Sequence, residues 1–103
     1  FKAGYLLAIA ENTLIEIEQT NYYQIFADEN RVTAVYFKEE LTEMENLIEK
    51  IEKILIPVSL YLFSWGNRSE FETMFEHIGN VTVKTIPQPI LEIYKKIYNI
   101  LNI

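Results

Sequence analysis

The chain has 103 residues, of which 50% are hydrophobic and 23% charged, and it contains no cysteine. This composition predicts a single folded domain over residues 1–103 and excludes a disordered chain or a disulfide scaffold. Nine Lys and Arg against fifteen Asp and Glu give a net charge of -6, whereas a domain that binds nucleic acid on its own is usually basic.

The first 40 residues predict an antiparallel meander of up to four strands. The predicted strands are Tyr5–Ala10, Thr13–Glu18, Tyr22–Ala27 and Val32–Phe37. The second of them approximates the alternation of apolar and polar residues that is typical of a half-buried strand. The dipeptide Glu11-Asn12 would then connect the first two strands as a two-residue hairpin.

From Leu41 onward the apolar residues change to helical spacing. The residues of this stripe are Leu41, Met44, Leu47, Ile48, Ile51, Ile54 and Leu55. They predict an amphipathic helix of about 13 residues, and Thr42 followed by Glu45 has the spacing of a capping box. Pro57 stops the helix or lies just beyond its end, and the apolar run Val58–Phe63 predicts a strand covered on both faces.

The last third of the chain predicts a helix, a strand and a final helix. The first helix has capping-box spacing at Ser69 and ends near Gly79, a residue suited to a left-handed position. The strand Val81–Lys84 follows, and Ile90–Leu101 carries apolar residues at helical spacing. Strands that alternate with helices are expected to pair in parallel. The predicted fold is α/β (or α+β), with a single mixed sheet, an antiparallel N-terminal meander, a βαβα-type C-terminal half and three helices.

The loop at residues 65–69 is the strongest candidate for a ligand site. It follows a predicted parallel strand and opens a helix, and ligands often bind at this edge of α/β sheets, where helix N-termini favour anions. Tight turns between a strand and a helix also use Trp and Gly for packing alone. The candidate contact residues for a ligand or partner are Trp65, Asn67, Arg68, Ser69 and Lys84.

The sequence lacks the motifs of the common self-contained chemistries. With His77 as the single histidine and no cysteine, only carboxylates could complete a metal site. The three glycines are isolated and form no phosphate-binding loop. We therefore predict no catalytic, cofactor-binding or metal-binding residue, and a structural or solvent-facing role for His77.

Neither a membrane span nor an export sequence is predicted. The longest apolar stretch, Ile54–Phe63, is interrupted by Pro57 and is shorter than the ~20 residues that cross a bilayer. The N-terminus has no basic region followed by an apolar run and a cleavage site. We expect a cytoplasmic protein without membrane contact and, because the chain begins at Phe1, a fragment of a longer protein.

Three segments resemble the C-terminal part of bacterial adenine-specific DNA methyltransferases, including type III modification-like subunits. They are Lys2–Leu7, Tyr61–Gly66 and above all Val83–Lys95. The family's F-x-G-x-G element, which binds S-adenosylmethionine, and its (D/N/S)-P-P-(Y/F/W) element, which holds the flipped adenine, do not occur in this sequence. The resemblance therefore implies a non-catalytic accessory domain of a restriction-modification enzyme. It assigns S-adenosylmethionine and methyl transfer to the rest of the parent protein.

The resemblance implies contact with the catalytic domain of the parent protein and, through the parent, with DNA. The charge of -6 favours protein contact over a broad DNA-binding surface, while Arg68 and Lys84 leave room for a local DNA contact. Two other hypotheses stay open. One is a small stand-alone α/β ligand-binding domain or enzyme that uses the loop at 65–69, and the other is a homodimer that pairs through an edge strand or the final helix.

Overall fold

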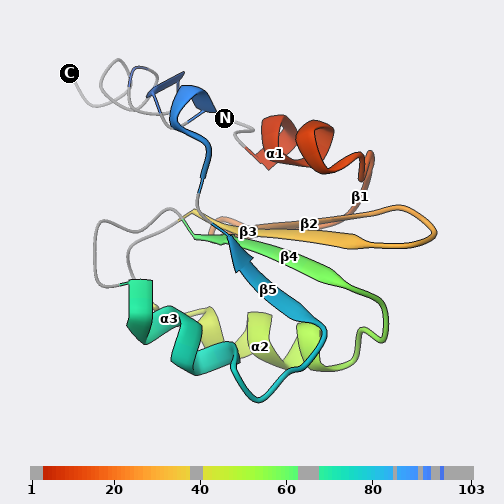
Figure 1. The fold of residues 1–103 in the computed structure, drawn as a ribbon, viewed down its shortest axis with the longest axis vertical. Coiled ribbons are helices and arrows are strands. Elements are labelled where there is room, and N and C mark those ends of the chain that lie inside the picture. The colour runs from red at the N-terminus through yellow and green to blue at the C-terminus, as the bar shows by residue number, and fades with distance from the viewer. Residues whose placement is uncertain are drawn as a thin grey trace.

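The computed structural model describes residues 4–37, 41–62, 68–84, 86–90, 92–93 and 96, and only the backbone for residues 68–71. Within these residues five strands form one mixed sheet with helices on both faces (Figure 1). The strands lie in the sheet in chain order, β1-β2-β3-β4-β5. The predicted α/β class with a single mixed sheet is therefore confirmed.

The helices are α1 (Gly4–Glu11), α2 (Met44–Glu52) and α3 (Arg68–Phe75), and residues 88–90, 92–93 and 96 are also helical. The strands are β1 (Ile15–Gln19), β2 (Tyr23–Ala27), β3 (Val32–Tyr36), β4 (Val58–Leu62) and β5 (Val81–Lys84). The first three strands pair antiparallel, whereas β4 lies parallel to β3 and β5 parallel to β4. The sheet therefore changes from antiparallel to parallel at β3.

The first of the four predicted strands is wrong, because residues 4–11 form helix α1. A short apolar run does not separate a buried strand from a buried helix by its pattern, and the recurring Leu and Ala are strong helix formers. The helix ends at Asn12, which has a φ of 62°, and the amide of Thr13 donates to the carbonyl of Ala8 at 2.8 Å. Asn is one of the residues that accept this left-handed position, so Glu11-Asn12 is a helix end and not the predicted hairpin turn.

Helix α2 is shorter than its apolar stripe. Leu41 and Leu55 lie outside the helix, and both are exposed. The amide of Ile54 donates to the carbonyl of Ile51, three residues earlier. Such a bond tightens the last turn of a helix, so the chain leaves the helix before Leu55.

The predicted helix caps are wrong where the structure describes them. Glu43 occupies the N-cap position of α2 and makes no side-chain cap hydrogen bond, so the capping box at Thr42 does not form. Ser69 lies inside α3, which begins one residue earlier. Gly79 has no positive φ. The spacing of apolar residues therefore predicts the presence of α2 and α3, but not the residues at which they begin and end.

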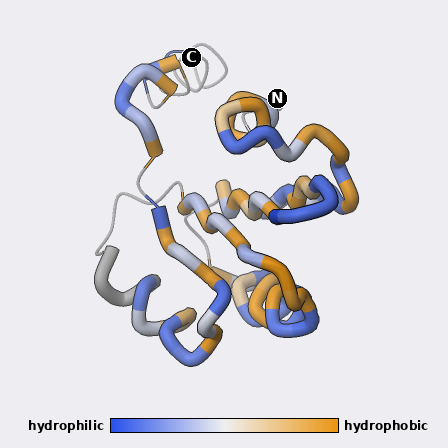
Figure 2. Tube along the Cα trace, turned by 45° about the vertical axis from the view of Figure 1, so that its right-hand side comes forward, coloured by the Kyte–Doolittle hydropathy of each residue, from blue (hydrophilic) through white to orange (hydrophobic). Residues whose placement is uncertain are grey.

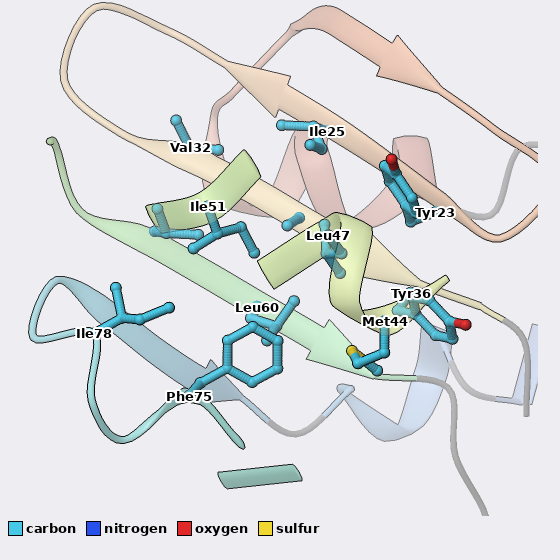
Figure 3. Close-up of a cluster of buried hydrophobic side chains, with 12 residues drawn as sticks. Tyr23, Ile25, Val32, Tyr36, Met44, Leu47, Ile51, Leu60, Phe75 and Ile78 are labelled. Atoms are coloured by element: carbon cyan, nitrogen blue, oxygen red, sulfur yellow. The ribbon is translucent and has the colours of Figure 1, made fainter. Parts of the chain in front are cut away.

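Two cores lie on opposite faces of the sheet. The larger core packs α2 and the end of α3 against the sheet (Figure 3) and consists of Tyr23, Ile25, Val32, Ala34, Tyr36, Met44, Leu47, Ile51, Val58, Leu60, Phe75 and Ile78. The smaller core joins Leu7 of α1 to Val35, Tyr61 and Ile86. Because both faces of β3 are covered, all five of its residues are buried. Polar groups beneath α1 must therefore find their partners inside the protein.

Candidate functional site

The predicted ligand loop falls mostly outside the described residues. Trp65 and Asn67 lie in the gap at 63–67, and Arg68 and Ser69 are described only as backbone at the start of α3. Lys84 is described in full, and its Nζ donates to Glu11 Oε1 at 2.9 Å. The loop stays a prediction, whereas Lys84 belongs to a polar cluster around Glu11 that the sequence analysis missed.

This Glu11 cluster consists of Glu11, Arg31, Ser59, Tyr61 and Lys84. The carboxylate of Glu11 is buried at the end of α1. Its Oε1 also accepts a hydrogen bond from the Tyr61 hydroxyl at 2.6 Å, and its Oε2 accepts one from the Ser59 hydroxyl at 3.2 Å. The guanidinium of Arg31 lies 3.7 Å from Oε2. A buried charge is tolerated when it is paired and hydrogen-bonded in this way.

Strand geometry brings the members of the Glu11 cluster together. Side chains two residues apart point to the same face of a strand, so Ser59 and Tyr61 face α1 while Leu60 enters the larger core. In the parallel register Tyr61 lies beside Lys84 on β5. Ser59 and Tyr61 carry hydroxyl groups at alternate positions of the apolar run 58–63. This spacing was the sequence feature that could have indicated a polar cluster on the α1 face of the sheet.

The electrostatics of the cluster hold Glu11 charged. Burial is the largest influence and raises the pKa of Glu11, but the hydrogen bonds from Lys84, Tyr61 and Ser59 and the charge of Lys84 outweigh it, so the pKa is lowered. Burial also raises the pKa of Tyr61, and the hydrogen bond to Glu11 and its negative charge add to that rise. Neither group changes protonation near neutral pH, so the pair is poorly placed for acid/base catalysis.

Further polar contacts hold both ends of α1 on the sheet. The amide of Gly4 donates to Gln24 Oε1 at 3.2 Å, and the hydroxyls of Thr13 and Thr33 lie 2.7 Å apart. A Cβ at Gly4 would lie 2.2 Å from Gln24 Oε1, so a larger residue here would displace the Gln24 side chain and its hydrogen bond. A carboxylate at a helix C-terminus is unfavourable because of the helix dipole, and the two cations of the Glu11 cluster offset this. These contacts make the cluster a structural anchor for α1.

The outer side of α1 and the adjoining strand expose aliphatic side chains. We define the α1–β1 apolar surface as the exposed side chains of Leu6, Ile9, Leu14, Ile15 and Ile17, and Figure 2 shows the apolar character of α1. These are five of the eight large apolar residues that are exposed in the described part of the chain, and they fall within twelve positions of sequence. Ile15 pairs with Ala27, which packs against the larger core, so Ile15 is on the sheet face away from α1 and the surface extends around the edge of the sheet. Ile9, Leu14 and Ile15 are 63%, 67% and 65% exposed. Scattered exposed apolar residues are ordinary, but their concentration in one short segment makes this surface the main candidate for a contact with another molecule in the described part of the chain.

A groove of about 270 Å³ lies between α3 and β5. It is lined by Glu72, Phe75, Glu76, Val81, Thr82 and Val83. The carboxylates of Glu72 in α3 and of Glu76 just after it make this groove unfavourable for a phosphate or another anion. The groove therefore does not provide the anion site that the sequence suggested for the start of this helix.

Comparisons with known proteins returned no match, neither a protein-family model nor a curated protein nor a solved structure. In the described ranges no helix is long and apolar enough to cross a membrane. The same ranges contain no group of three His, Cys, Asp or Glu side chains that could hold a metal ion. His77 is exposed, with Nε2 at 3.0 Å from Glu52 Oε1. The fold defines an α/β domain with helices on both faces of a mixed sheet.

Proposed function

We propose that this chain is a non-catalytic accessory domain that works by contact with a protein partner. The partner in this proposal is the catalytic domain of an adenine-specific DNA methyltransferase, as the sequence resemblance implies. The observation that supports protein contact most is the α1–β1 apolar surface. Two of its side chains, Leu6 and Ile9, lie on helix α1, whose inner side is held to the sheet by the Glu11 cluster, and the other three lie in or just before β1.

The size of the surface accounts for part of the free energy that a stable contact needs. Burial of one exposed Leu or Ile side chain stabilises by ~1.5–3 kcal/mol. Five side chains that are roughly half exposed therefore offer on the order of 5 kcal/mol. Association costs ~4–15 kcal/mol in lost freedom, so the partner must add further contacts beside the aliphatic residues.

The charge distribution favours a protein partner over direct DNA binding. Residues 41–80, which include α2 and α3, contain seven Glu against two Lys and one Arg. A DNA backbone would be repelled from this side of the sheet. On the other side Lys84 is already paired with Glu11. Any DNA contact of the parent protein is therefore expected to be made mainly by its other parts.

The first test separates an accessory domain from a catalytic one. S-adenosylmethionine titrated into this chain in a calorimeter should give no binding. Cofactor binding at micromolar concentration would contradict the proposal, because methyl transfer and cofactor binding are assigned to the partner. The alternative, a ligand-binding domain or enzyme at the loop 65–69, predicts a small-molecule site that Arg68→Ala disrupts.

The second test locates the contact. We expect Ile9→Lys to weaken binding of the methyltransferase catalytic domain on the order of tenfold or more, because it places a charge in the apolar surface. Leu55→Lys is the matched control, since Leu55 is 91% exposed outside this surface and the change in net charge is the same. Equal binding by the two variants would show that the α1–β1 apolar surface is not the contact.

A further inference from the structure

Strand β1 lies at the edge of the sheet beside this surface. It pairs with β2 on one side, and no described strand pairs with its other side. An edge strand presents backbone donors and acceptors to which another chain can add a strand. Exposed Ile15 and Ile17 add an apolar contribution at the same edge, which ties it to the α1–β1 apolar surface.

Acidic side chains accompany these aliphatic residues. Glu16 and Glu18 alternate with Ile15 and Ile17, and β1 itself contains no Lys or Arg. Glu18 contacts Lys50, whereas the partner of Glu16 among the described residues is the neutral amide of Gln24, at 3.1 Å. The turn after β2 contains Asp28 and Glu29 together with Arg31, whose amide donates to Asp28 at 2.8 Å. Ile15 lies opposite Ala27, the last residue of β2, so the acidic turn at 28–29 is next to the same end of β1.

We propose that β1 binds an extended segment of the partner as an added strand, and that this segment carries apolar residues together with Lys or Arg. The proposal rests on the proposed function and names how the partner binds. Opposite charges on neighbouring strands stabilise a sheet, whereas like charges destabilise it. A basic strand would therefore complement Glu16.

The same charges disfavour a second copy of this chain as the occupant. Antiparallel pairing of two β1 strands would bring the carboxylates of the two copies together without any basic residue in the strand. The register shift between Glu16 and Glu18 interrupts the regular edge for any added strand alike, so it is the charge of β1 that distinguishes a basic partner from a second copy. The acidic residues disfavour pairing of two β1 strands, and the isoleucines remain exposed. This combination is expected for a strand that pairs with a chain of opposite charge.

The probe for this proposal is a ten-residue peptide of alternating Val and Lys, compared with one of alternating Val and Glu. Amide resonances and hydrogen exchange of the chain are followed by NMR as each peptide is added. We expect the Val-Lys peptide to shift the resonances of residues 15–19 and slow the exchange of their amides. The Val-Glu peptide should leave them unchanged.

Two variants at Glu16 and a charge control sharpen this test. Glu16→Lys should weaken binding of the Val-Lys peptide on the order of fivefold. Glu16→Gln, which removes the negative charge without adding a positive one, should weaken it about twofold. Glu49→Lys changes the net charge by the same amount from the exposed side of α2 and should bind like the wild type. Equal loss in Glu49→Lys, or shifts away from residues 15–19, would overturn strand addition.

The outcome also separates this proposal from the proposed function. If Ile9→Lys loses the catalytic domain while the Val-Lys peptide leaves β1 unchanged, strand addition is wrong and protein contact through the surface stands. If the catalytic domain does not bind the wild type at all, the proposed function is wrong. Strand addition to the methyltransferase is then wrong as well.

Discussion

The two faces of the sheet are held by different means. On one face α2 and α3 bury a continuous apolar core of twelve residues. On the other face α1 contributes Leu7 to a core of four residues. It is held there by the hydrogen bonds that Glu11, Gly4 and Thr13 make with residues of the sheet. The difference shows that a helix whose buried apolar side chains are one leucine and one alanine can still be held on the sheet by polar contacts, while its other aliphatic residues stay exposed.

The largest loss of stability is expected from a substitution in the larger core, on the apolar face. Leu47→Ala in α2 removes a fully buried side chain from the larger core, and we expect a loss of ~2–5 kcal/mol in the free energy of unfolding. Urea denaturation followed by circular dichroism measures it. The control is Leu55→Ala, which lies on the same segment but is exposed and should change stability by less than ~0.5 kcal/mol.

The second-largest loss of stability is expected from Glu11→Ala, on the polar face. This change leaves the Tyr61 and Ser59 hydroxyls and the Lys84 amine without their shared acceptor. We expect a loss of ~1–3 kcal/mol in urea denaturation. Glu49→Ala on the exposed side of α2 is the matched control, and an equal effect of the two would contradict the anchoring role.

The pH dependence sharpens the comparison further. The folded pKa of Glu11 is lowered below its ordinary value of 4.5, so its contribution to stability is complete above that value and is lost as the pH falls through the folded pKa. The stability difference between wild type and Glu11→Gln should therefore shrink below about pH 4. Leu47→Ala should keep its deficit across the same range. A constant difference for Glu11→Gln would show that the charge of Glu11 does not stabilise the fold.

The smallest effect is expected at the rim of the Glu11 cluster. Arg31 is half exposed and 3.7 Å from the carboxylate, so solvent screens the pair and Arg31→Ala should cost less than ~0.5 kcal/mol. Lys84→Met should cost more, because Lys84 donates a direct hydrogen bond at 2.9 Å. Thermal melts of both variants at low salt would show the order, and a larger loss for Arg31→Ala would contradict the geometry.

The sequence predicted the apolar face better than the polar one, for a physical reason. The stripe Met44, Leu47 and Ile51 and the apolar strand β4 are local patterns, and their burial follows from periodicity. The Glu11 cluster joins residues 50 and 73 positions apart, which no local spacing reveals. Helix α1 was predicted as a strand because its eight residues carry only one charged side chain. The loop at 65–69 stays a prediction.

The central proposal is that the chain acts through contact with a methyltransferase catalytic domain. The most direct measurement is an isothermal titration of that catalytic domain into the wild-type chain at 25 °C and moderate salt. The account predicts a one-to-one complex with a micromolar or tighter dissociation constant and a negative heat-capacity change from buried apolar surface. Absence of binding at a concentration of about 100 μM, well above a micromolar dissociation constant, would contradict it.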